Sequence, residues 1–328
     1  MTKFDVTGIG NAIVDVLAHA DDAFISNQGL HKGGMALIDA TRAEDLYRLM
    51  GDTVEISGGS AANTIAGVAA LGSKAAYIGK VADDPLGETF RKDIRATGSH
   101  YEVAPLRAAA PTARCLILVT PDGQRTMNTF LGASQELTPA DVDASLIQEA
   151  KVTYLEGYLW DPPKAKEAFV QAASIAHDAG REVSLSLSDA FCVDRHRDSF
   201  LDLIDSHVDI LFANETEITS LYQVNSFEEA ASKVAGQVKI AALTRSEEGS
   251  LIIVGGDRFQ VPAEPVAKVV DTTGAGDLYA AGFLYGHCRG FSPADCGRVG
   301  SIAAAEIIGH FGARPEVDLK TLLPAELR

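Results

Sequence analysis

Short apolar runs alternate with amphipathic segments along most of the 328-residue chain. The runs are bounded by turn residues, as expected for strands covered on both faces, and Pro or Gly marks the ends of the intervening helices. This alternation predicts a mostly parallel sheet with helices on both sides. The expected strands are 4–10, 75–80, 152–156, 182–187, 210–213, 240–244 and 250–254, and the expected helices include 85–97, 164–179 and 215–222.

Two segments, 12–38 and 112–130, carry shorter and more alternating apolar patterns than the rest. In the second, Pro121-Asp122-Gly123 separates the runs 115–119 and 126–130, which is a hairpin signal. Antiparallel strands inserted into an α/β chain would form either a small separate sheet, acting as a lid over a site, or an extension of the main sheet's edge. The spacing alone leaves both interpretations open.

The chain is acidic, with 28 Lys and Arg against 45 Asp and Glu and a net charge of −17. A nucleic acid or an anionic membrane surface is therefore not expected as the main partner, because its phosphates would be repelled. No run approaches the ~18 apolar residues that a membrane span needs. The four Cys residues are scattered without a C-x-x-C pair, which suits reduced thiols. We expect a cytoplasmic protein that makes no membrane contact.

The segment Asp271-Thr-Thr-Gly-Ala-Gly-Asp277 leads directly into a helical apolar pattern. A Gly-Ala-Gly turn that opens a helix presents unpaired N–H groups and the positive end of the helix dipole to one point, which makes an anion site without lysine. Asp277 then lies in the first helical turn. It either interacts only with the helix dipole or accepts a hydroxyl proton during phosphoryl transfer. The flanking Asp271 and two threonines favour the second interpretation.

Two further segments indicate a function only in combination with the segment 271–277. Gly58-Gly59-Ser-Ala-Ala-Asn63 enters an alanine-rich helix, which allows close approach of a small polar ligand, although a tight strand–helix connection would look the same. Asn214 and Glu217 lie three apart at a helix start. They would hold a hydrated Mg²⁺ or form a capping box, and in isolation the capping box is favoured.

In combination, these motifs resemble the ribokinase-like (PfkB) family of carbohydrate and nucleoside kinases. The segment 271–277 matches the family's C-terminal signature, 58–72 its N-terminal one, and 214–217 its Asn-x-x-Glu motif. The resemblance implies an α/β three-layer fold, with a mostly parallel central sheet flanked by helices and a small β-sheet lid. It also implies that residues 1–328 form a single kinase domain, with lid segments at about 12–38 and 112–130 inserted in it.

The same resemblance implies site residues and the use of ATP and Mg²⁺. Asp277 is implied as the base, and the amides of Gly274, Ala275 and Gly276 as the anion hole. Ser246 stands where the family's nucleotide loop, Thr-x-Gly-x-x-Gly, has its first glycine. Many members also use a monovalent cation such as K⁺. The remaining implied residues are Asp15, Gly59 and Asn63 for ribose, Asn214, Thr244, Gly249 and Thr273 for ATP, and Glu217 for Mg²⁺ through water.

Within this family, the segments 10–15, 32–35, 154–158 and 187–191 are similar to the adenosine-kinase branch. By this resemblance, Tyr158 and Phe191 flank a purine and Leu37 of the lid closes over it, because aromatic faces suit a flat base. The alternative is that both aromatic residues belong to the core. Arg125, in the hairpin, either reaches the phosphates or is a solvated surface residue.

We therefore expect ATP-dependent phosphorylation of the 5′-hydroxyl of adenosine or a related purine nucleoside. The alternative is a sugar kinase of the same fold that acts on ribose, fructose or a related sugar. A third possibility, from another class, is a catalytically silent ligand sensor. The sequence leaves monomer and homodimer equally open.

Overall fold

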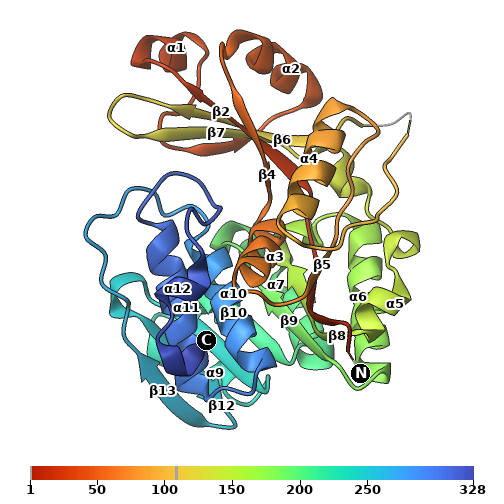
Figure 1. Cartoon of the computed structure of the whole chain (residues 1–328), viewed down its shortest axis with the longest axis vertical. Coiled ribbons are helices and arrows are strands. Elements are labelled where there is room, and N and C mark those ends of the chain that lie inside the picture. Colours follow the sequence, from red (N-terminus) through yellow and green to blue (C-terminus); the bar gives the residue numbers. More distant parts are fainter. Residues whose placement is uncertain (1, 108–109) are drawn as a thin grey trace.

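The computed structural model describes residues 2–107 and 110–328, whose strands gather in two separate sheets (Figure 1). The larger sheet contains, in spatial order among these residues, the strands β13 (Asp257–Val261), β12 (Ser250–Val254), β11 (Ile240–Thr244), β10 (Ile210–Asn214), β9 (Glu182–Ser186), β8 (Ala150–Glu156), β1 (Phe4–Ile9) and β5 (Ala75–Ile78).

This sheet is parallel from β5 to β11, as the alternation of strands and helices predicted. The strands β12 and β13 are antiparallel additions at one edge, joined through Gly255 and Gly256, which both have positive φ. β13 is an edge strand that the sequence analysis missed. The parallel strands all end at the same edge of the sheet, where ligands collect in folds of this kind.

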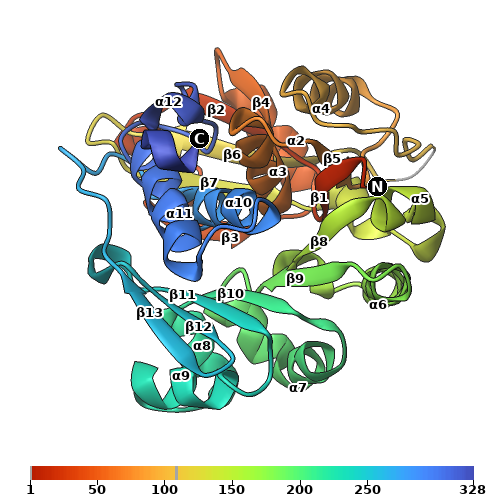
Figure 2. The same cartoon turned by 60° about the horizontal axis from the view of Figure 1, so that its bottom comes forward.

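Helices cover both faces of the larger sheet (Figure 2). The described residues contain no helix with the length and apolar character needed to cross a membrane. One face is covered by α3 (Ser60–Ala70), α4 (Pro85–Ala96), α10 (Ala275–Cys288), α11 (Pro293–Ile307) and α12 (Leu319–Leu322), and the other by α5 (Ala144–Gln148), α6 (Pro163–Asp178), α7 (Ala190–His207), α8 (Glu215–Tyr222) and α9 (Phe227–Val234).

The smaller sheet has the order β3 (Met35–Leu37), β7 (Arg125–Phe130), β6 (Ala113–Val119), β2 (Ile13–His19) and β4 (Val54–Gly58). The predicted hairpin is confirmed, since β6 and β7 pair in antiparallel fashion. The expectation of antiparallel strands was wrong for β2–β6 and β3–β7, which are parallel. The strand β4 also joins this sheet, although it lies outside the segments 12–38 and 112–130.

The smaller sheet is buried on one face and half-buried on the other. Val14 and Val16 belong to the same apolar cluster as Ile25 of α1 (Asp22–Asn27) and Leu46 of α2 (Ala40–Leu49). Figure 1 shows these two helices on the side turned away from the larger sheet. Because β1 runs into β2 after only three residues, the smaller sheet lies at the carboxyl edge of the parallel strands, with Asp15 on its half-buried face.

Short 3₁₀ turns follow several of these elements. The turn η3 follows β8 directly, and η4 follows β11. These turns are η1 (Gly132–Glu136), η2 (Pro139–Asp141), η3 (Gly157–Trp160), η4 (Ser246–Glu248) and η5 (Ala325–Leu327).

Candidate active site

Asp277 lies where the N-termini of α10 and α3 meet. Its carboxylate accepts hydrogen bonds from Ser60 Oγ at 2.6 Å and from Asn63 Nδ2 at 2.9 Å. Burial raises the pKa of Asp277 above its ordinary value, and these two hydrogen bonds and the charge of Arg314 offset part of the rise. The helix dipole alone would lower this pKa, so burial is the larger effect.

The turn before α10 is open to solvent on its outer side. Gly274 has a φ of +80°, and a Cβ there would lie 2.8 Å from Cβ of Ala313, so the position needs glycine. A Cβ on Gly276 would meet nothing within 4 Å. The amide of Ala275 donates to the Thr272 carbonyl at 3.2 Å, whereas the amides of Gly274, Gly276 and Asp277 have no acceptor among the described residues. These three amides are the donors that the turn offers to an anion.

Arg125 connects the smaller sheet to this turn. Its guanidinium is buried and forms an ion pair with Asp271, and it also donates to Thr273 Oγ at 3.2 Å. Asp271 in turn accepts the Thr273 amide at 3.0 Å and the Gly312 amide at 3.1 Å, so its carboxylate orders the start of the turn. Arg125 is therefore not a solvated surface residue in this structure.

Asp15 and Arg314 lie beside Asp277. Burial raises the pKa of Asp15 to about 6, Arg314 and Arg125 lower it, and the negative charge of Asp277 raises it further. A Cβ on Gly58 would lie 2.5 Å from the Asp15 carboxyl, which explains why a glycine faces this residue. No sequence motif marked Arg314, whose guanidinium donates to the Ser57 carbonyl at 2.8 and 3.1 Å and to the Ala62 carbonyl at 2.7 Å.

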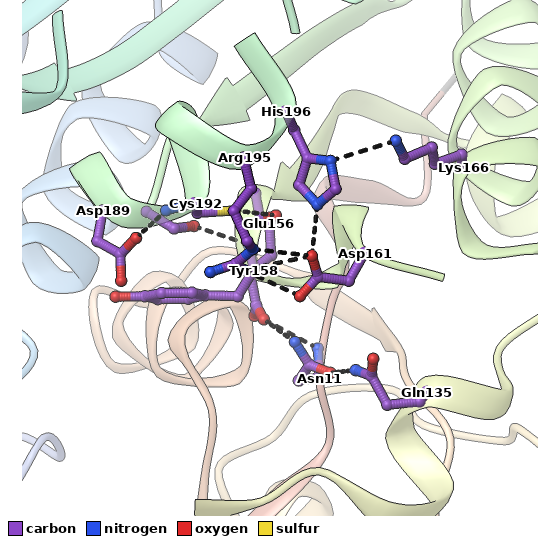
Figure 3. Close-up of polar contacts among 12 residues, drawn as sticks. Asn11, Gln135, Glu156, Tyr158, Asp161, Lys166, Asp189, Cys192, Arg195 and His196 are labelled. Carbon is purple, nitrogen blue, oxygen red and sulfur yellow. Dashed lines mark hydrogen bonds and ion pairs between the residues drawn. The ribbon is translucent and has the colours of Figure 1, made fainter. Parts of the chain in front are cut away.

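Glu156 is a second residue whose role the sequence analysis did not identify. Its carboxylate is buried and accepts the Asn11 amide at 3.1 Å, Asn11 Nδ2 at 2.7 Å and the Ala61 amide at 2.7 Å (Figure 3). Gly59, between β4 and α3, has a φ of +97°, and a Cβ there would lie 2.2 Å from the Asn11 carbonyl. Glu156 therefore ties the end of β1 to the start of the helix that carries Ser60 and Asn63.

The expected base-binding residues come from three elements. Tyr158 is half-buried in η3, and the charges of Asp189 and Asp277 lie near enough to raise its pKa further above the value that burial alone would give. Phe191, in the first turn of α7, is 66% exposed, and Leu37 of β3 is 55% exposed. The alternative that both aromatic residues are core is wrong for Phe191.

The residues expected on the ATP side follow β10 and β11. Asn214 and Glu217 form a capping box at the start of α8, and burial raises the pKa of Glu217 to about 7. Thr244 ends β11 and Gly249 has a φ of +83°. Ser246 has a φ of +49°, so this serine adopts the left-handed backbone for which the family pattern uses glycine.

The described residues show no cluster of three or more His, Cys, Asp or Glu side chains arranged to hold a metal ion. Any Mg²⁺ at Glu217 would therefore depend on water and on the substrate's phosphates for most of its ligands.

Comparisons with known proteins agree with this geometry. A sequence profile of the pfkB family of carbohydrate kinases matches residues 32–319. The chain is 56% identical to the solved structure of a probable sugar kinase from Rhizobium etli CFN 42, with a TM-score of 0.91 over 98% of each chain. It is 55% identical to the solved adenosine kinase from Sinorhizobium meliloti, with a TM-score of 0.90 over 97% of this chain and 98% of that one. Adenosine kinase 2 of Arabidopsis thaliana is 25% identical over 93% of this chain and 94% of that protein.

The buried Glu156 gives a prediction about stability and pH. Burial raises its pKa from 4.5 to about 7 in the folded chain, so the folded state binds this proton more tightly than the unfolded state. The stabilisation is complete below the unfolded pKa and is lost as the pH rises through about 7. The free energy of unfolding of the wild type should therefore fall between about pH 5 and pH 8. In Glu156→Gln, which has no proton to lose, this fall should be smaller by on the order of 3 kcal/mol.

Urea denaturation at both pH values measures this change. The Gln variant should also be less stable at both pH values, because its Nε2 cannot accept a hydrogen bond, whereas both carboxyl oxygens of Glu156 accept one in either protonation state. Glu167→Gln, at an exposed pair with Lys164, is the control and should keep the wild-type pH dependence. An unchanged dependence in Glu156→Gln would contradict the assigned shift.

Proposed function

The chain belongs to the pfkB family of carbohydrate kinases, and we propose that it transfers the γ-phosphoryl group of ATP to the 5′-hydroxyl of a purine nucleoside, in the first place adenosine. Phosphotransfer to a hydroxyl group follows from the family, and the nucleoside and the residue roles are the proposal. The observation that supports these roles most directly is the Asp277 carboxylate, held by Ser60 and Asn63 next to amides without an acceptor among the described residues.

In this proposal Asp277 accepts the proton of the attacking hydroxyl. Its two hydrogen bonds fix the direction of the carboxylate, and its raised pKa brings its proton affinity closer to what a general base needs near neutral pH. The amides of Gly274, Gly276 and Asp277 would stabilise the charge that spreads over the transferred phosphoryl oxygens. Asp15, whose carboxylate has no hydrogen-bond partner among the described side chains, would accept from the ribose hydroxyls.

ATP would lie along the ends of β10 and β11, beside Asn214, Thr244, Gly249 and Thr273. Carboxylate oxygens suit Mg²⁺, and each oxygen of Glu217 keeps a lone pair beyond its capping-box hydrogen bond, so this residue fits a water-mediated contact. Mg²⁺ held near Glu217 would neutralise charge on the phosphates of ATP.

The exposed apolar side chains support a nucleoside over a simple sugar, whereas overall similarity does not separate the two. Phe191 and Leu37 expose large apolar side chains that pack into no core, and such surfaces suit a flat base. The similarity to the adenosine kinase of Sinorhizobium meliloti extends over nearly the whole chain. A sugar kinase remains the second candidate, because the chain is equally similar to the probable sugar kinase of Rhizobium etli CFN 42.

A substrate screen tests the proposed function. We expect ADP release, measured with a coupled assay, to be fast with purine nucleosides such as adenosine, inosine and guanosine, because the aromatic surface binds the base. The resemblance to adenosine kinases ranks adenosine first among them. Ribose and fructose should give little turnover. Turnover with a sugar and none with any nucleoside would establish the second candidate instead.

The proposed base is tested by Asp277→Asn. Loss of a general base should lower kcat by about 10²–10⁴-fold, while adenosine binding measured by calorimetry persists. Asp295→Asn is a matched control, because Asp295 also lies in the first turn of a helix and bonds to a serine, Ser292, but has no recorded bond to the Asp277 group. Near-normal turnover in Asp277→Asn would refute the assigned role.

We also propose that the smaller sheet acts as a lid, formed mainly by the segments 12–38 and 112–130. Its contact with the anion turn through Arg125 and Asp271 supports this proposal. Hydrogen exchange in both segments should slow when adenosine is added, because closure protects the backbone amides, whereas α9 should exchange at the same rate. Unchanged exchange in the lid would count against closure.

A further inference from the structure

A group of polar residues outside the proposed reaction site joins the two elements that carry Tyr158 and Phe191. Asp161 directly follows η3, and its carboxylate faces Arg195 and His196 of α7 (Figure 3). Arg195 donates to both carboxylate oxygens, with Nη2 at 3.0 and 3.2 Å and Nε at 3.3 Å. His196 Nε2 also bonds to Asp161. We call Asp161, Arg195 and His196 the Asp161 cluster.

The cluster lies at a break in α7. His196 has φ −126° and ψ 18°, which is not helical, so residues 190–195 form a first turn whose direction the rest of the helix does not determine. The two residues at the break, Arg195 and His196, are the ones that bond to Asp161. Buried Cys192 and Val193 anchor this segment in the core, and Cys192 Sγ donates to the Gly157 carbonyl of η3 at 3.2 Å. The cluster adds a second, polar connection between the segment and η3.

Phe191 lies in that first turn. Its ring is mostly exposed, so core packing does not hold it in place. The Arg195 guanidinium covers one face of the ring, 4.4 Å from the ring centre. A guanidinium is attracted to the face of an aromatic ring. A carboxylate that accepts two of its hydrogen bonds restricts the orientation of the guanidinium and keeps it in position. Asp161 thus fixes Arg195, Arg195 fixes the ring, and the other face of the ring stays free.

We propose that the Asp161 cluster is a positioning element for nucleoside binding, in which Asp161 acts through Arg195 to hold the Phe191 ring against the purine. This inference rests on the proposed function. In this inference Asp161 does not contact the reacting atoms. Substitution of Asp161 should therefore lower nucleoside affinity and leave the chemical step unchanged.

The test is a double-mutant cycle on adenosine kinetics. Asp161→Ala and Arg195→Met should each raise the KM for adenosine about three- to tenfold, which corresponds to loss of one cation–π contact and of the order it imposes. The KM for ATP and kcat should stay within about twofold of wild type. Phe191→Ala should raise the KM for adenosine at least as much. In the Phe191→Ala background, Asp161→Ala should have no further effect.

Asp194→Ala is the matched control, because it removes an aspartate–arginine pair from the same helix, with Arg197 as the partner. It should leave every kinetic constant unchanged, whereas a general need for ion pairs on α7 would make it behave like Asp161→Ala. Asp161→Asn, which keeps a hydrogen-bond acceptor, should restore part of the affinity.

Two results overturn the inference while leaving the proposed function intact. One is a KM effect of Phe191→Ala without any effect of Asp161→Ala. The other is an undiminished effect of Asp161→Ala in the Phe191→Ala background, because Asp161 would then act by another route. Wild-type turnover of sugars without nucleosides would overturn the proposed function and this inference together.

Discussion

The contact of Asp277 with Ser60 and Asn63 depends on the whole fold. These residues are more than two hundred positions apart in the sequence, and each lies in the first turn of its helix. Only a sheet that places α3 and α10 on the same face brings the two N-termini together. The glycines before both helices have positive φ, so the chain can turn sharply enough for the helices to start beside each other. The parallel core therefore positions the carboxylate, and the loops complete the site.

Buried charge is balanced locally in this site, although the chain as a whole is strongly acidic. Asp15, Glu156 and Asp277 all have raised pKa values, because burial disfavours their charged forms. Arg314 opposes this effect at Asp15 and Asp277, but its own guanidinium is occupied by main-chain carbonyls. Its four hydrogen bonds to Ser57 and Ala62 leave at most one N–H for a ligand, so it supplies mainly positive charge. In the proposed function, backbone amides of the turn before α10 are therefore the main anion donors.

The sequence predicts the features of this protein that are local. The strands of the larger sheet, the hairpin before Phe130 and the glycine turn at 274–276 each follow from residues that are close in the chain. The positions of Arg314 and Glu156 do not, because each acts on residues brought near only by tertiary packing. The same reason explains β4, whose place beside β2 depends on sheet pairing and not on its own pattern. At Ser246 the residue type itself misleads, because a serine adopts the left-handed backbone conformation for which the family pattern uses glycine.

The division of the site into two parts bears on substrate choice. The residues around Asp277 and the Gly274 turn would meet a hydroxyl and a phosphoryl group, which nucleosides and sugars share, so they cannot separate the two classes. In the proposed function, discrimination comes from Tyr158, Phe191 and Leu37, of which the last lies on the smaller sheet. Leu37 is on β3, which pairs with β7, the strand that begins at Arg125. If Leu37 contacts a base as proposed, the β3–β7 pairing would connect that contact to the pair of Arg125 with Asp271. Base recognition would then be coupled to the order of the turn before α10.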